Sequence, residues 1–329
     1  MTAHMNESQS QNPVEAVAGR RFNVNIRDAG TLLGLLLIFA VFSFLAPSFM
    51  TGANFLNILQ QSSINACIAL GMTFVIISGG IDLSVGPTAA ISAVVGALLM
   101  SAGISIPVAL FGALATGMAC GLFSGSLVAF AGLQPFIVTL GGLSLFRALA
   151  LIVTGGNPIF GIPQEFRSVI NGQFLGIPTT VVIVAIIAFL LWVVLNRSPL
   201  GEYILAVGGN QEAARIAGVP VTRTKITVYV LSGGLAAVAG MILVGRLGAA
   251  DPTMGNLWEL NAIAAAAIGG ASLMGGKGSV FGTLLGAIIL GALTNGLTLL
   301  NVQAFYQLLA TGIIILVAML IDRATRGTA

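Results

Sequence analysis

Charged residues are scarce in this chain of 329 residues, where Asp, Glu, Lys and Arg together make up 7%. A typical soluble domain carries about 25%. Hydrophobic residues make up 57%, and the mean hydropathy is +1.04. Because so little charge cannot cover a water-facing surface, the composition excludes an ordinary soluble domain and indicates a membrane protein.

Cysteine and histidine are almost missing as well. The two cysteines, Cys67 and Cys120, lie in apolar runs, so we expect reduced thiols that fill space and no disulfide framework. The one histidine, His4, lies in the polar N-terminal tail. This position excludes most His-based catalysis, most His-ligated metal sites and an intramembrane protease that pairs histidine with serine. We therefore expect no catalytic residues and no metal site.

Long apolar runs, by contrast, follow one another along most of the chain. A hydrocarbon core about 30 Å thick needs roughly 20 apolar residues per helix, and these runs are too long for the strands of a membrane barrel. The sequence therefore predicts an all-α polytopic membrane domain over 29–322 with about ten transmembrane helices. The predicted spans are 29–46, 61–79, 87–103, 107–131, 135–154, 179–196, 225–246, 257–275, 279–300 and 304–322.

The basic residues indicate the orientation, because cytosolic loops carry the excess of Lys and Arg. With ten spans, both termini share one face, and we predict that this face is cytosolic. The polar tails are 1–28, which we expect to be disordered, and 323–329; a periplasmic loop covers 155–178 and a cytosolic loop 197–224. Ten of the thirteen basic residues then lie inside: Arg20, Arg21, Arg27, Arg197, Arg215, Arg223, Lys225, Lys277, Arg323 and Arg326.

The cytosolic loop contains a short helix whose two ends are both specified. Asn210 is a good N-cap, and Glu212 in the first turn suits the positive end of a helix. Ala213 and Ala214 favour helix, and Gly218 is a natural residue just past its end. A helix of about two turns is unstable alone in water. We therefore expect it to dock, either on its own bundle or on a partner.

This segment resembles the EAA loop of ABC import permeases, the element that docks into a groove of the ATPase subunit. Glu212, Ala213, Ala214 and Gly218 carry the resemblance, and Arg215 lies between them. The resemblance implies that 210–218 couples the chain to an ATPase.

Four further segments resemble the ribose-type monosaccharide permeases. They are 71–86, whose structural signature is Gly79, Gly80, Asp82 and Gly86, then 135–141, 259–264 and 275–279. The match covers roughly residues 30–322. One departure is that the wider EAA pattern continues to Ile-x-Leu-Pro, whereas Leu231 is followed here by Ser232. That difference favours the sugar branch.

The resemblance implies the permease subunit of a bacterial inner-membrane importer for ribose or a related pentose, hexose or polyol. Its implied partners are a second copy or a paralogous permease, an ATPase with two nucleotide-binding halves, a periplasmic sugar-binding protein and membrane lipid, with no nucleic acid. ATP and Mg²⁺ would bind the ATPase, and this chain would need no cofactor. The loop around Lys277 is no phosphate loop, because Ala271 and Gly278 replace required residues.

An ion-coupled secondary sugar transporter is the alternative. It would need titratable groups near the membrane midplane, whereas Asp82, Asp251 and Glu259 fall near the ends of predicted spans. For Asp82 we favour a capping role at the cytosolic start of the third span over direct sugar contact.

Polar and aromatic residues within spans are candidates for lining a sugar path. The polar candidates could exchange hydrogen bonds with hydroxyls, and the phenylalanines could form constrictions; interhelical bonding or core packing is the alternative for each. They are Asn65, Asn261, Asn295, Phe74, Phe136 and Phe305, with Gln60, Gln61, Ser62 and Thr294 as further polar candidates.

Two glycine ladders and one arginine complete the unusual residues within spans. Gly117, Gly121 and Gly125, and likewise Gly278, Gly282 and Gly286, recur every fourth residue. They predict close helix contacts, either within the chain or between two copies. Arg147 lies within a span and needs a partner, which the sequence does not identify.

Overall fold

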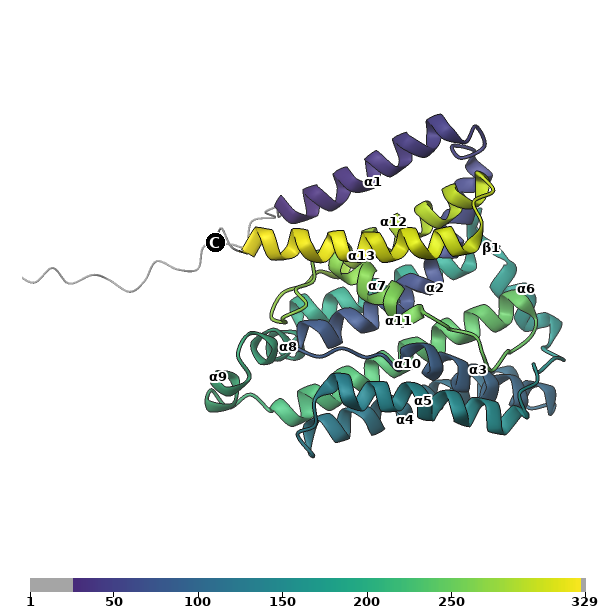
Figure 1. Ribbon diagram of the computed structural model, residues 1–329. Coiled ribbons are helices and arrows are strands. Elements are labelled where there is room, and N and C mark those ends of the chain that lie inside the picture. The colour runs from purple at the N-terminus through teal and green to yellow at the C-terminus, as the bar shows by residue number, and fades with distance from the viewer. Residues whose placement is uncertain (1–25, 327–329) are drawn as a thin grey trace, which may run out of the picture.

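The computed structural model describes residues 26–326, which are mostly helical (Figure 1). The all-α polytopic fold is confirmed. Of the predicted tails, 1–25 and 327–329 lie outside the described residues, whereas 26–28 and 323–326 belong to helices. Ten helices correspond to the predicted runs: α1 (Ile26–Leu45), α2 (Gly52–Ile77), α3 (Val85–Ser101), α4 (Ile106–Ala129), α5 (Pro135–Thr154), α7 (Thr179–Arg197), α10 (Val221–Leu247), α11 (Trp258–Ile268), α12 (Val280–Leu299) and α13 (Ala304–Arg326).

The two long loops contain elements of their own at opposite ends of the bundle (Figure 1). The predicted loop 155–178 forms the short helix α6 (Gln164–Asn171) and a two-stranded hairpin of β1 (Gln173–Phe174) and β2 (Ile177–Pro178). The predicted loop 197–224 contains α8 (Pro199–Gly209) and α9 (Gln211–Ile216). We call the end with α6 the outer end and the end with α9 the inner end. These ends define the outer and inner sides of the molecule used below.

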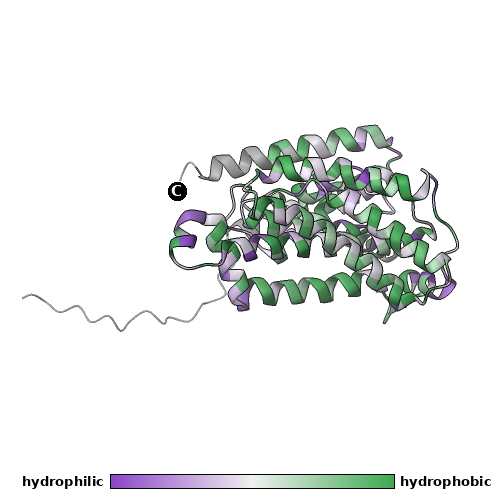
Figure 2. Ribbon diagram, turned by 90° about the horizontal axis from the view of Figure 1, so that it is seen from below, coloured by the Kyte–Doolittle hydropathy of each residue, from purple (hydrophilic) through white to green (hydrophobic). Residues whose placement is uncertain are grey.

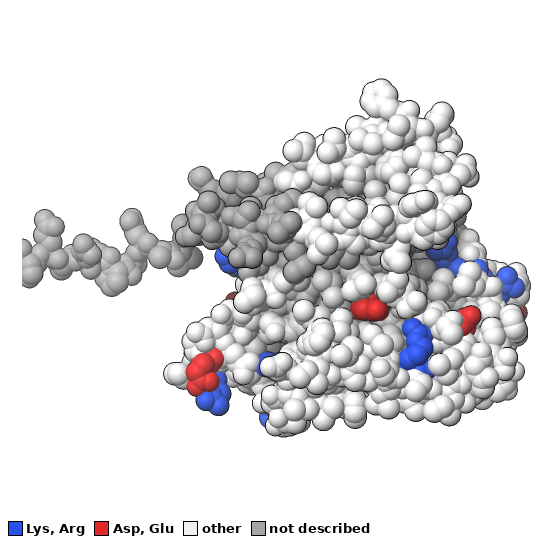
Figure 3. All heavy atoms as spheres, viewed as in Figure 1, with Lys and Arg blue, Asp and Glu red and all other residues white. Residues whose placement is uncertain are grey.

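The bundle has the surface of a membrane protein. Within residues 26–326, six helices are long and apolar enough to cross a membrane: α2, α4, α5, α7, α10 and α12. Hydrophobic residues dominate along the helices, and hydrophilic ones gather towards the ends (Figure 2). Charged side chains are few on the face in Figure 3, where most of the surface belongs to uncharged residues.

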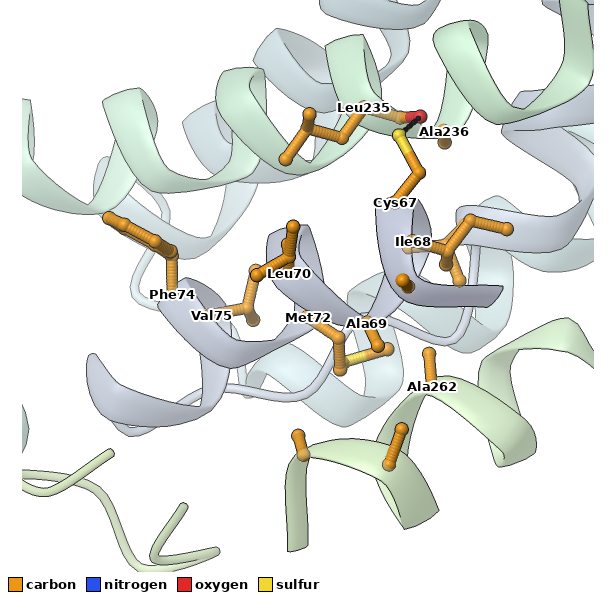
Figure 4. Close-up of a cluster of buried hydrophobic side chains, with 14 of the residues drawn as sticks. Cys67, Ile68, Ala69, Leu70, Met72, Phe74, Val75, Leu235, Ala236 and Ala262 are labelled. Atoms are coloured by element: carbon orange, nitrogen blue, oxygen red, sulfur yellow. Dashed lines mark hydrogen bonds between the residues drawn. The ribbon is translucent and has the colours of Figure 1, made fainter. Parts of the chain in front are cut away.

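Helix α2 lies at the centre, and its neighbours cover it on all sides. Its side chains pack against α7, α10, α11 and α12 in one large apolar cluster. Figure 4 shows part of this cluster, where Leu70, Met72 and Phe74 lie between α10 and α11. The thiol of Cys67 donates to the carbonyl oxygen of Leu235 at 3.4 Å, and both cysteines are free and buried, as expected.

The glycine ladders pack helices within this chain. A Cβ added at Gly117 would overlap the carbonyl oxygen of Gly233, and one at Gly121 would overlap that of Tyr229, so the first ladder lets α4 lie directly on α10. In the second ladder, Gly286 lies on the backbone of Ala265 in α11. Both ladders are therefore occupied by contacts inside the chain and are excluded as a seam between two copies.

Two helices, α3 and α11, begin inside the bundle, and each follows a segment that returns into it. The inner segment, 78–84, leads from α2 to α3; the outer segment, 248–257, leads from α10 to α11. Gly86 and Gly255 touch where the two helices begin. From there α3 runs to the outer side and α11 to the inner side, as in transporters with broken helices.

The predicted span 257–275 is wrong in its extent. Its helix, α11, has 11 residues, about 16 Å, which is too short to cross the hydrocarbon core. The remaining residues form a turn containing Gly270 and Gly275, both with positive φ. A glycine-rich apolar run looks like a helix by hydropathy, but here its backbone is satisfied by contacts with other parts of the chain.

Candidate functional site

Asp82 lies in the inner segment, in the interior of the bundle. Its Oδ1 accepts hydrogen bonds from the backbone N–H of Ser84 at 3.0 Å and from the Ser84 hydroxyl at 2.6 Å. Its Oδ2 accepts from the Ser232 hydroxyl at 3.0 Å, and the residue is 2% exposed. The carboxylate thus holds the turn before α3, but the predicted capping role is wrong, because the N-cap of α3 is Ser84 and, within the described residues, Asp82 makes no hydrogen bond to the first turn of the helix.

The predicted position of Asp82 near the cytosolic surface is wrong. Its partner Ser232 lies eleven residues after Val221 in α10, about 16 Å along the helix. Asp82 is therefore roughly halfway through the bundle. The reason is the backbone at Gly79, whose positive φ of 84° turns the chain back after α2 and lets the inner segment re-enter.

Helix α5 supplies hydrogen-bond donors to both returning segments. The hydroxyl of Thr139 donates to the carbonyl oxygen of Ile81 in the inner segment at 3.1 Å. The Arg147 guanidinium donates to the carbonyl oxygens of Pro252 and Met254 in the outer segment, at 2.6 and 2.8 Å. Non-helical backbone at membrane depth needs such partners. The sequence could not identify the partner of Arg147, because carbonyl oxygens carry no residue-specific signal.

The inner ends of α2 and α8 meet the glycine turn after α11. The N–H of Gly276 donates to the carbonyl oxygen of Ile77, the last residue of α2, at 2.8 Å. Gly208 near the end of α8 lies against both of these residues. The segments 71–86 and 275–279, which the sequence analysis singled out separately, are therefore one structural unit at the inner side.

The geometry of α9 agrees with its predicted ends. The Asn210 side chain accepts from the N–H of Ala213 at 3.0 Å, which makes it the N-cap. Gly218 has a φ of +85°, and its N–H donates to the carbonyl of Arg215 at 3.0 Å. The N–H of Val219 donates to Ala214 at 3.0 Å, which completes a Schellman motif. Each predicted cap residue therefore occupies its expected place.

The outward face of α9 is exposed at the inner end of the molecule. Arg215 and Glu212 form an ion pair at 2.7 Å, with their side chains 70% and 64% exposed. Ile216 is 81% exposed, whereas Ala214 is buried against the body of the protein. Figure 3 shows acidic and basic side chains protruding together at the end where Figure 1 places α9. This small surface combines charge with one apolar side chain and is available to a partner.

A polar cavity of about 320 Å³ lies between α2, α10, α11, α12 and α13. Asn65 lies near the middle of α2, whereas Arg246 lies at the outer end of α10, so the cavity extends from the bundle centre towards the outer side. Amides, hydroxyls, a guanidinium and an indole are the groups that bind sugar hydroxyls and cover sugar rings. The polar and aromatic lining is Gln61, Ser62, Asn65, Arg246, Trp258, Asn261, Thr294 and Thr311.

Of the six main candidates for lining the sugar path, all of which the structure describes, two line the polar cavity and four do not. Asn65 and Asn261 share the polar cavity. Asn295 instead exchanges two hydrogen bonds with Asn54, at 2.9 and 3.0 Å, and Phe74 is fully buried in the core.

The remaining two aromatic candidates, Phe136 and Phe305, are 53% and 60% exposed. Among the described residues that line the polar cavity, neither of these two is present, nor are Asn295 and Phe74. Sequence reasoning missed Arg246, Trp258 and Thr311, because they become neighbours only through helix packing.

Comparison with known proteins identifies the family. The pattern of the family described as "Branched-chain amino acid transport system / permease component" matches residues 54–319. The ribose import permease protein RbsC of Bacillus subtilis is 44% identical over 304 residues, covering 92% of this chain and 94% of that protein. RbsC of Escherichia coli (strain K12) is 43% identical over 314 residues, covering 94% and 98%. The D-allose transport system permease protein AlsC of E. coli is 40% identical, covering 89% and 91%.

These matches fit the six apolar helices and identify a multi-pass protein of the bacterial inner membrane. The relatives are named as transport subunits and not as enzymes. The chain belongs to the ribose-type permeases, the membrane-spanning subunits of ATP-binding-cassette sugar importers.

Proposed function

We propose that this chain moves D-ribose or a closely related monosaccharide through the polar cavity, and that an ATPase drives it by docking on α9. The observation that carries the proposal is the position of α9. It is a fully capped helix with an exposed ion pair, at the inner end of a bundle whose polar cavity lies further out. ATP and Mg²⁺ would bind the ATPase and not this chain.

Membership of the family implies an ATPase and a periplasmic binding protein as partners. We further propose an ATPase with two nucleotide-binding halves and a second permease subunit, either a copy of this chain or a paralogue. The polar cavity supports a second subunit, because its lining residue Gln61 is exposed on the surface of the bundle. A neighbouring subunit would cover this residue and separate the cavity from lipid.

In this mechanism the binding protein releases sugar at the outer end of the polar cavity. Asn65, Asn261 and Trp258 hold it weakly at the bundle centre, beside the meeting point of Gly86 and Gly255. Movement of α9 by the ATPase rocks the helices and opens the way inward. Selectivity then lies largely with the binding protein.

An ion-coupled transporter is not favoured. The relatives are permeases of import systems. Two carboxylates, Glu259 and Asp82, are buried where α11 and α3 begin, and Asp82 uses both oxygens for bonds to Ser84 and Ser232. A carboxylate held in this way supports the turn before α3 and is poorly placed to bind and release a coupling ion.

The test is uptake of radiolabelled D-ribose into proteoliposomes that contain the permease, its ATPase and its binding protein. We expect uptake only with ATP and all components, and competition by unlabelled D-allose, D-galactose or L-arabinose ranks the substrates. Uptake that persists without the ATPase, and that an ion gradient drives, would overturn the proposal in favour of the ion-coupled alternative.

A further inference from the structure

Gly208, in the last turn of α8, lies where three stretches of backbone touch. A Cβ added at Gly208 would overlap the carbonyl oxygen of Ile77 and would lie 2.6 Å from the backbone nitrogen of Gly276. A Cβ added at Gly275 would lie 2.7 Å from the carbonyl oxygen of Gly208. The Gly276–Ile77 hydrogen bond of 2.8 Å joins the other two stretches. We call Gly208, Ile77, Gly275 and Gly276 the glycine joint.

The glycine joint is made of backbone on backbone. Side chains can change rotamer and absorb a displacement, whereas close-packed backbone transmits it. Only Asn210 follows Gly209 before α9 begins, so any movement of α9 acts directly on the end of α8.

The glycine joint is connected to both returning segments, directly to the inner one and through α11 to the outer one. After Ile77 the chain enters the inner segment, which carries Asp82 to the bundle centre. On the other side, the turn containing Gly276 continues from α11, whose first turns carry Trp258 and Asn261 in the polar cavity. A displacement at Gly208 therefore reaches the meeting point of α3 and α11 by two routes.

The other connection from α9 to the bundle is looser. The chain continues from α9 to α10 through residues 217–220, four residues against the single Asn210 between α8 and α9. The Lys225 ammonium at the start of α10 also donates to the Gln211 side chain at 2.6 Å, in an exposed position. Because this bond joins two long side chains and not packed backbone, α10 transmits movement from α9 less directly than the glycine joint does.

The geometry points to Gly208 as a positioning residue that transmits movement of α9 through the glycine joint to both returning segments, so that ATP use opens the sugar path. This inference rests on the proposed function. It predicts a specific defect when the joint is forced apart: the ATPase still docks and hydrolyses ATP, but little sugar moves.

The test compares Gly208→Ala with Gly209→Ala in the complete transporter in proteoliposomes. A Cβ at Gly209 meets no described atom within 4 Å, so this neighbour is a matched control. For Gly208→Ala we expect uptake of D-ribose per ATP hydrolysed to fall at least about tenfold, a change of 1.4 kcal/mol, while ATPase co-purification and hydrolysis stay within about twofold. Gly209→Ala should resemble the parent in all three measurements. A parallel loss of uptake and hydrolysis, or no loss in either, overturns the inference.

A second measurement decides the case if Gly208→Ala fails to assemble. Spin labels on Gly209→Cys and on Met274→Cys, which is 77% exposed, report the distance across the joint. We expect this distance to stay constant between the nucleotide-free and ATP-bound transporter, while the distance from Gly209→Cys to a label at the outer residue Asn157→Cys changes. Any other pattern overturns the inference. A parent transporter without ATP-dependent uptake would instead refute the proposed function.

Discussion

Gly86 and Gly255 lie backbone against backbone where α3 and α11 begin, and a Cβ added at Gly255 would lie 2.6 Å from the carbonyl oxygen of Gly86. This contact joins the start of α3, which follows the inner segment, to the outer segment. Two stretches of main chain that enter the bundle from opposite ends therefore meet inside it.

The variant Gly255→Ala should destabilise the protein. Gly255 has a φ of +77°, where a side chain costs about 1–2 kcal/mol, and the added Cβ must displace the Gly86 backbone, at about 1–3 kcal/mol more. We expect a lower thermal unfolding midpoint in detergent. Gly141→Ala is the control, because a Cβ there meets no described atom within 4 Å. Equal midpoints for the two variants would contradict the close contact.

Replacing Arg147 should loosen the outer segment. Arg147→Met leaves the carbonyl oxygens of Pro252 and Met254 without their donor, and each unpaired buried group costs about 1–3 kcal/mol. Arg147→Lys can restore one of the two bonds, so its loss should be smaller. Unfolding midpoints should rank parent, Lys variant and Met variant in falling order. The exposed Arg223→Met should leave the midpoint unchanged, and a similar fall there would indicate an effect of charge alone.

The N-cap of α9 should control binding of the ATPase. Asn210→Ala removes the hydrogen bond to the N–H of Ala213 and lowers the stability of the helix by about 1 kcal/mol. If docking requires the folded helix, association with the ATPase becomes roughly fivefold weaker. Asn210→Ser keeps an N-capping side chain and should restore binding. The measurement is the dissociation constant of permease and ATPase in detergent. If Ala and Ser bind equally well, the order of α9 does not limit docking.

Two asparagines should separate transport from stability. Asn261→Leu removes an amide from the polar cavity. We expect D-ribose uptake to fall at least about tenfold, which corresponds to a loss of about 1.4 kcal/mol in the free energy of sugar binding. The thermal unfolding midpoint should stay unchanged. Asn295→Leu breaks the two hydrogen bonds with Asn54. Because the Asn54 amide then lacks its partner, the thermal unfolding midpoint should fall, whereas uptake per folded protein should change less than for Asn261→Leu. The reverse result would place the sugar path elsewhere.

Features that depend on short stretches of chain could be predicted from the sequence. The apolar runs predicted the ten helical regions because hydrophobicity and length are local properties. The ends of α9 were predicted because Asn210 and Gly218 cap it through neighbouring backbone groups. The capping role predicted for Asp82 is wrong, since Ser84 is the N-cap of α3 and Asp82 bonds to Ser84 before the helix begins.

Tertiary structure decided the rest, because the partners there are backbone groups and distant helices. Hydropathy could not show that α11 is a helix of only 11 residues, too short to cross the membrane. Nor could it show that Asp82 lies midway through the bundle, or that Arg147 donates to the carbonyl oxygens of Pro252 and Met254. Glycine spacing predicted close packing but not the partner, which is α10 for the ladder of α4. The polar cavity exists only where five helices meet. The sequence by itself therefore determined the membrane fold and the two ends of α9, whose signals are local, whereas the candidate site is a product of long-range packing.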